Sequence, residues 1–238
     1  MKIDILAIGA HPDDVELSCA GTLAKEIANG KQVAILDLTQ GELGTRGTAK
    51  IRANEAKDAA KVLGVKARYN LNFVDGFFKN DNEHQLQLVT YIRFLKPDII
   101  LCNAVEDRHP DHGRAAAMVV ESCFLSGLHQ VKTTYEGHTQ DAWRPRQVYH
   151  YIQWNDVHPD FVVDISGYID IKLKAVNAFA SQFFDPQMLA PETPISSQNF
   201  LDSVKYRAAN LGRLIGVDYA EGFTAMRLLA VDRINDLM

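Results

Sequence analysis

The first half of the chain alternates short apolar runs with longer segments of helical periodicity. Apolar runs of strand length occupy residues 3–9, 32–39, 67–73 and 98–103. Apolar residues recur at helical spacing between and after them, which predicts helices at 15–29, 50–63, 84–95 and 113–125. Strands that alternate with helices through short links form a parallel sheet covered on both faces. The pattern therefore predicts an α/β, three-layer fold with a mostly parallel sheet.

The second half of the chain is less regular. Residues 126–146 are polar and predict an excursion from the sheet, and the segments that follow predict strands at 147–153 and 160–164. Helices are expected at 167–184 and 200–215, separated by a loop at 185–199 that contains three prolines. This part predicts a C-terminal α/β extension. Because no linker or internal repeat interrupts the pattern, we expect one domain over residues 1–238.

Composition narrows the class of protein. The chain has 238 residues, of which 47% are hydrophobic and 23% charged, and its formal net charge is -5. A negative net charge argues against a general binder of nucleic acid or of anionic membranes. No apolar run approaches the ~20 residues of a membrane span, and no signal segment precedes the first strand. We therefore expect a cytoplasmic protein whose three cysteines, which lack metal-binding spacing, are buried thiols.

Two polar clusters follow predicted strands at distant points of the chain. His11-Pro12-Asp13-Asp14 comes directly after the strand at 3–9, and His109-Pro110-Asp111-His112 follows the strand at 98–103. The two clusters become neighbours if these strands lie side by side in a doubly wound sheet. Ligands bind at that place in such sheets.

The residue types of the clusters predict a catalytic metal site. His11, Asp14 and His112 are the expected ligands of one Zn²⁺ ion per chain, and three protein ligands leave a fourth position open to water. Other divalent metals such as Fe²⁺ also accept nitrogen and oxygen donors. Each cluster alone has an ordinary alternative, since His-Pro pairs are frequent in turns and an aspartate often caps a helix. Two such clusters after neighbouring strands favour the catalytic interpretation.

The remaining cluster residues have expected catalytic roles. Asp13 is the expected general base for the attacking water. His109 is expected across the site, where it would stabilise the oxyanion and pass a proton to the leaving amine. Asp111 is expected to hydrogen-bond one of the histidines and so define its tautomer.

Three arginines are candidates for contact with substrate. Arg46 lies in a glycine-rich loop after the strand at 32–39, and Arg52 follows in the next helix. Their guanidinium groups could bind hydroxyl or carboxylate groups, although the segment also fits a flexible loop that leads into a helix. Arg108 precedes the second cluster and is expected to border the pocket, where it would favour an anionic substrate. Its alternative is a surface ion pair with the adjacent acids.

The paired clusters resemble the signature of the PIG-L, or LmbE-like, zinc deacetylases. The resemblance extends to Arg52, to Ser181-Gln182-Phe183 and to the segment 216–223. It implies a Rossmann-like fold and the removal of an N-acetyl group from an N-acetylglucosamine conjugate. It also implies Asp111 as the charge partner of His109 and Arg52 as a contact to sugar hydroxyls.

The resemblance is strongest to the bacillithiol-pathway branch, which deacetylates N-acetylglucosaminyl-malate. It implies a small amino-sugar conjugate as partner and, because hexamers are frequent in the family, a homo-oligomer. Two alternatives stay within the deacetylases: free or oligomeric N-acetylglucosamine, and a mycothiol-type conjugate. A third alternative, a non-catalytic sugar-binding module, would not need a base beside an open metal site.

Overall fold

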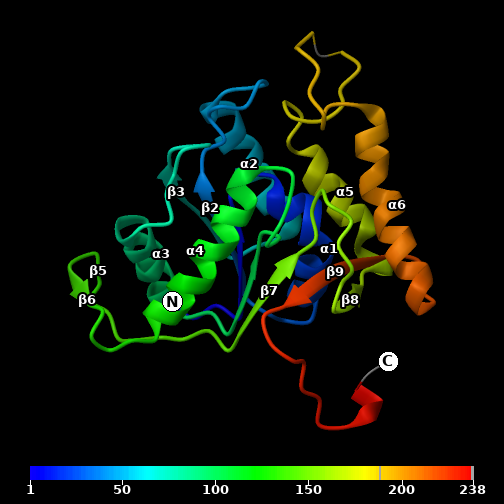
Figure 1. The fold of residues 1–238 in the computed structure, drawn as a ribbon. Helices are drawn as coiled ribbons and strands as arrows, with labels where there is room; N and C mark the ends of the chain where they lie inside the picture. The colour runs from blue at the N-terminus through cyan, green and yellow to red at the C-terminus, as the bar shows by residue number, and fades with distance from the viewer. Residues whose placement is uncertain (188, 237–238) are drawn as a thin grey trace.

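A computed structural model of the chain describes residues 1–187 and 189–236 and contains a seven-stranded sheet in the order β3-β2-β1-β4-β7-β9-β8 (Figure 1). Neighbouring strands run parallel from β3 to β7: β3 (Ala67–Phe73), β2 (Val33–Thr39), β1 (Ile5–Gly9), β4 (Ile99–Cys102) and β7 (Gln147–Tyr151). β9 (Ala220–Ala225) is antiparallel to both β7 and β8 (Phe161–Asp164). The predicted mostly parallel α/β sheet is thus confirmed, including the pairing of β1 with β4.

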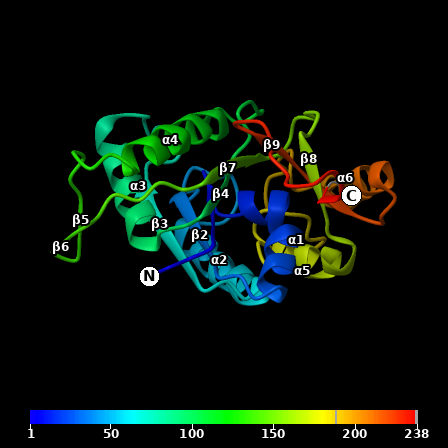
Figure 2. The same cartoon turned by 90° about the horizontal axis from the view of Figure 1, so that it is seen from below.

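Helices cover both faces of the sheet (Figure 2). One face carries α1 (Asp14–Ala28), α2 (Ala49–Leu63) and α5 (Ile169–Asn177), and the other carries α3 (Asn82–Leu95) and α4 (Pro110–Ser126). Side chains of a strand alternate between the faces. Leu6 and Ile8 of β1 accordingly pack in the core beneath α3 and α4, whereas Ile5 and Ala7 pack against α1 and α5. The predicted three-layer arrangement is therefore observed.

The remaining elements lie at the margins of these layers. A long helix, α6 (Gln198–Ile215), packs beside β9. The predicted excursion contains a small hairpin, β5 (Thr134–Tyr135) with β6 (His138–Thr139), which the sequence pattern did not indicate. Short 3-10 turns occur at Ser166–Tyr168 and Ile234–Asp236. None of the described helices is long and apolar enough to cross a membrane.

Two expectations for the second half were wrong. The helix expected at 167–184 ends at Asn177, because the Ser181 backbone N–H donates to Glu55 Oε1 at 2.7 Å instead of continuing the helical ladder. The Gln182 side chain likewise donates to the Arg46 carbonyl at 2.8 Å. The segment 220–225, for which no strand was predicted, is the sheet strand β9.

Helix α1 is interrupted at Cys19, whose φ of -135° is not helical. A buried ion pair bridges the interruption: Lys172 Nζ lies 2.6 Å from Glu221 Oε1. Lys172 also donates to the Leu17 carbonyl at 2.7 Å. The Glu221 carboxylate accepts the backbone N–H groups of Gly21 and Thr22 at 3.0 and 2.7 Å. The pair thereby satisfies backbone groups on both sides of the interruption, in the helix that begins at Asp14.

Candidate metal centre and active site

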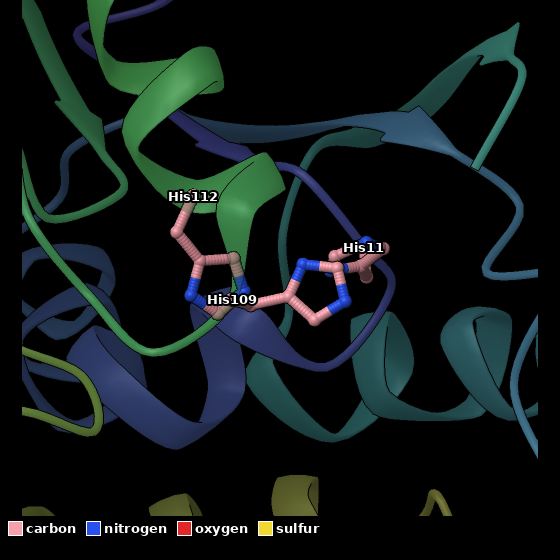
Figure 3. Close-up of side chains that lie close together, drawn as sticks. All are labelled: His11, His109 and His112. Atoms are coloured by element: carbon pink, nitrogen blue, oxygen red, sulfur yellow. The ribbon is translucent and has the colours of Figure 1, made fainter. Parts of the chain in front are cut away.

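The two polar clusters meet at the carboxyl ends of β1 and β4. His11 lies between β1 and α1, His109 caps the N-terminus of α4, and His112 lies in the first turn of α4 (Figure 3). The ring centroid of His11 is 4.6 Å from that of His109 and 5.5 Å from that of His112. Gly9 permits the tight turn after β1, since a Cβ there would lie 2.9 Å from the His11 carbonyl oxygen. The predicted meeting of the clusters is therefore observed.

A carboxylate lies between two of the imidazoles. Asp14 Oδ1 is 3.2 Å from His112 Nε2, and Asp14 Oδ2 is 3.6 Å from His11 Nδ1. The opposite nitrogen of each ring faces a further carboxylate: His112 Nδ1 is 2.6 Å from Asp107 Oδ2, and His11 Nε2 is 3.0 Å from Asp75 Oδ1. Histidines that bind metals characteristically present the second nitrogen to a carboxylate in this way.

This donor set fits a divalent metal ion. Two ring nitrogens lie beside one carboxylate, the types of donor found in catalytic zinc sites, and Asp14 is 3% exposed. His109 borders this donor set, because ligand atoms of all three histidines lie within 4.8 Å of one another. A second grouping, His11 with Asp75 and Asp111, fits less well. Its carboxylates are already engaged by the backbone N–H groups of Leu43 and Gly76.

The electrostatics of the cluster favour positive charge. Burial alone would lower the pKa of His112, but Asp14 and Asp107 outweigh it and raise the pKa to about 9. For His11, burial is likewise opposed by hydrogen bonds to Asp111, Asp14 and Asp75, and its pKa is raised well above the ordinary value. The pKa of Asp14 is correspondingly well below its usual range, because the two imidazoles outweigh the effect of burial. The negative charges that keep these imidazoles protonated would also favour the binding of a metal cation.

Asp13 adjoins this centre in a strained backbone conformation. Its φ of 117° is unusual for a residue with a side chain and marks stored local strain. Arg52 holds the residue from α2: its Nη2 is 2.8 Å from Asp13 Oδ2 and also donates to the Pro12 carbonyl. Burial, opposed by the Arg52 charge, raises the pKa of Asp13 to about 7. A carboxyl group with this pKa can accept and release a proton near neutral pH.

His109 presents one nitrogen to the cavity because the other is engaged. Its Nδ1 accepts the backbone N–H of Asp111 at 3.2 Å, so the neutral ring carries its proton on Nε2. Burial and the neighbouring His11 and His112 lower the pKa of His109, which favours the neutral ring. The charge of Asp111 opposes this lowering of the His109 pKa. The Asp111 carboxylate directly contacts other groups: it lies 3.3 Å from His11 Nε2 and accepts from Arg114 Nη1 at 2.5 Å.

The centre opens into a cavity of about 340 Å³. His11, Asp13, Asp14, His109 and His112 line its inner end, and it is bordered by loops that follow β2, β3, β4 and β7. This is the switch-point location that the doubly wound sheet predicted.

The three candidate arginines have different positions. Arg52 and Arg108 line the cavity, and the Arg108 guanidinium lies 4.6 Å from the ring centroid of Trp154. Arg46 was expected to bind substrate but is buried outside the described lining, where it donates to the Phe183 carbonyl at 3.1 Å. The glycine-rich loop packs against Arg52, since a Cβ at Gly41 would lie 2.1 Å from Arg52 Nη1, and Gly44 and Thr45 of the same loop line the cavity.

Several residues of the site were missed by sequence reasoning. Asp75 and Gln153 each lie two residues after the end of a strand, β3 and β7, so the rule that found the clusters at strand ends could have found both. Asn103, immediately after β4, donates to Asp14 Oδ2 at 2.9 Å. Asp107 lay in an acidic run that was interpreted only as a partner for Arg108. Arg207 of α6 lines the cavity without any sequence signal.

Comparison with known proteins agrees with this geometry. A family model described as GlcNAc-PI de-N-acetylase (PIG-L) matches residues 6–123. Diacetylchitobiose deacetylase from Thermococcus kodakarensis is 32% identical over 75% of this chain and 70% of its own length.

Two solved structures are similar over nearly the full chain. The conserved protein TT1542 from Thermus thermophilus is 35% identical with a TM-score of 0.85, covering 97% of this chain and 98% of its own. N,N'-diacetylchitobiose deacetylase from Pyrococcus horikoshii is 26% identical with a TM-score of 0.78, covering 100% of this chain and 88% of its own. Together with the convergence of the two clusters, these similarities show that the chain belongs to the PIG-L family of de-N-acetylases, enzymes that hydrolyse amide bonds.

Proposed function

We propose that this protein is a zinc-dependent deacetylase that removes the N-acetyl group from a glucosaminyl conjugate, with N-acetylglucosaminyl-malate as its preferred substrate. One observation carries the proposal: the Asp13–Arg52 pair adjoins a carboxylate flanked by two imidazoles, inside one cavity. A base beside a three-ligand centre is the arrangement that metal-assisted amide hydrolysis requires.

His11, Asp14 and His112 would hold the ion. Bound zinc supplies a Lewis acid and lowers the pKa of water to about 7. Asp13, oriented by Arg52, accepts the proton of the water that attacks the acetamide carbonyl. His109 donates its Nε2 proton in a hydrogen bond to the carbonyl oxygen as negative charge develops there. Because His109 is neutral, we assign the second proton transfer to Asp13 and not, as the sequence led us to expect, to His109. The proton held by Asp13 passes to the nitrogen as the C–N bond breaks, which releases acetate and a free amine.

A second substrate class has a specific observation in its favour. Diacetylchitobiose deacetylase is 32% identical to this chain, and its name describes an oligomer of N-acetylglucosamine as substrate. Deacetylation of a chitooligosaccharide is therefore the alternative to the malate conjugate. Both reactions would use the same metal centre and the same base.

Release of primary amine tests the proposal. Metal-stripped enzyme is assayed with N-acetylglucosaminyl-malate, N,N'-diacetylchitobiose and free N-acetylglucosamine, before and after addition of Zn²⁺ or, anaerobically, Fe²⁺. Zinc-restored turnover that favours the malate conjugate is expected. A preference for diacetylchitobiose would replace the proposed substrate but retain the reaction. Absence of amine release from all three substrates, with metal bound, would contradict the proposed function.

The role of Asp13 is tested separately. Asp13→Asn should lower kcat by about 10²- to 10⁴-fold, because it removes the group that accepts the proton. Metal analysis should still find one zinc ion per chain, since Asp13 is not among the proposed ligands. The matched control is Asp58→Asn, at an exposed residue on the surface of α2, which should leave kcat unchanged. Full activity of zinc-loaded Asp13→Asn would exclude Asp13 as the base.

A further inference from the structure

A second cavity, with a volume of about 520 Å³, adjoins the active-site cavity. Both cavities are lined by Leu17, Ser18, Trp154, Val204 and Arg207. The metal centre lies in the first cavity alone. The shared residues place the two cavities side by side, and a substrate that reached from the first into the second would pass Arg207.

The walls of the second cavity are mainly apolar, with few charged groups. Lys172 and Glu221 line it but neutralise each other at 2.6 Å, and Asp156 is exposed. Arg207 is the other cation of its described lining. Arg207 is thus the cation of the described lining that has no ion pair within 4.0 Å, and it shares the cavity with the exposed Asp156.

Arg207 differs from the other arginines that lie near the cavities. Arg52 is paired with Asp13, Arg46 donates to a backbone carbonyl, and Arg108 lies over Trp154. Within residues 1–187 and 189–236, the half-buried Arg207 guanidinium has no hydrogen bond and no carboxylate within 4.0 Å. Burial lowers the pKa of Arg207 more than the nearby charges of Asp156 and Asp107 raise it, so the guanidinium has lost water without receiving a hydrogen bond from the described residues in return. An anion supplied by a ligand would compensate that loss.

We infer that Arg207 is a specificity-determining residue that binds a carboxylate on the aglycone of the substrate, with the aglycone lying in the second cavity. The inference rests on the proposed function, which places the amino sugar in the first cavity. The planar guanidinium matches a carboxylate in a two-bond arrangement, and the apolar walls suit the carbon skeleton that carries it. A neutral chitooligosaccharide would leave this cation without a partner.

The test compares two substrates that differ only in charge: N-acetylglucosaminyl-malate and the same glycoside with both carboxyl groups converted to amides. Arg207→Gln should lower kcat/KM for the malate conjugate by about 10- to 100-fold, the range expected for a charged hydrogen bond. The loss should appear mainly in KM, while the diamide changes less than about twofold. Arg207→Lys should retain part of the preference for the malate conjugate over the diamide, because lysine keeps the positive charge but lacks the planar guanidinium group that binds both carboxylate oxygens.

The matched control is Arg213→Gln, at an exposed position on the same helix that lines neither cavity. It should leave both substrates unaffected. Equal losses on the two substrates with Arg207→Gln would indicate a structural role and overturn the inference, as would no loss on either.

Calorimetric titration with the deacetylated product, glucosaminyl-malate, separates this inference from the proposed function. Wild-type enzyme should bind this product more tightly than its diamide, and Arg207→Gln should abolish the difference. If no substrate is turned over but this binding pattern is found, the proposed reaction fails and the role of Arg207 stands. If the wild-type enzyme binds the two forms equally, the inference is wrong even where turnover is observed.

Discussion

Removal of the Lys172 ammonium group should destabilise the fold more than any surface charge change. The Lys172 and Glu221 side chains are 2% and 3% exposed, and their charged atoms are 2.6 Å apart. Lys172→Met leaves the Glu221 carboxylate buried without a cation, and the carbonyl groups of Glu16 and Leu17 lose their donor. Breaking one partner of a buried pair typically costs about 3–5 kcal/mol of unfolding free energy. We expect a loss in that range.

Urea denaturation followed by tryptophan fluorescence and circular dichroism measures this cost. The control Lys61→Met removes one partner of an exposed pair, Lys61–Asp58, and should change the unfolding free energy by no more than about 1 kcal/mol. The double variant Lys172→Met/Glu221→Gln removes both buried charges. Its loss of unfolding free energy should therefore be smaller, by about 1–3 kcal/mol, than the sum of the losses of the two single variants. Additive losses, or a Lys172→Met cost as small as the control, would refute the reasoning.

Three further predictions concern the metal centre, the packing of α6 and the thiols. Asp107→Asn should weaken zinc affinity by about 10- to 100-fold in a chelator competition, because Asp107 orients His112 through Nδ1 at 2.6 Å; unchanged affinity would contradict that role. Gly212→Ala should cost about 1–3 kcal/mol in urea denaturation, since its Cβ would lie 2.7 Å from the backbone at 218–219, whereas Gly167→Ala, which meets nothing within 4 Å, should not. The native protein at pH 8 should not react with a thiol reagent, because burial raises the pKa of Cys123 to about 12 and that of the other two cysteines well above the ordinary value; a thiol titrating rapidly without denaturant would disprove this.

The extent of sequence-based prediction differed between the two halves of the chain. In the first half, every predicted strand and helix is present, because local apolar periodicity and sheet register agree there. In the second half, helix α5 ends early because Ser181 and Gln182 bond to groups on or before α2. β9 carries only a short apolar signal, and it becomes a strand because β7 and β8 both pair with it. The local spacing of apolar residues does not indicate which distant strands a segment will pair with.

The sequence by itself determined that the two clusters follow strands and contain the residues of a metal-assisted hydrolase. Strand order then brought the clusters together at the edge where parallel strands end. Only the tertiary structure decided which carboxylate faces which imidazole, that Asp111 contacts His11, and that Arg46 donates to the Phe183 carbonyl. It also placed Arg207, some hundred residues after the second cluster, at the junction of two cavities. Residue type and local spacing define what a side chain can do, but its partners depend on packing between segments far apart in the chain.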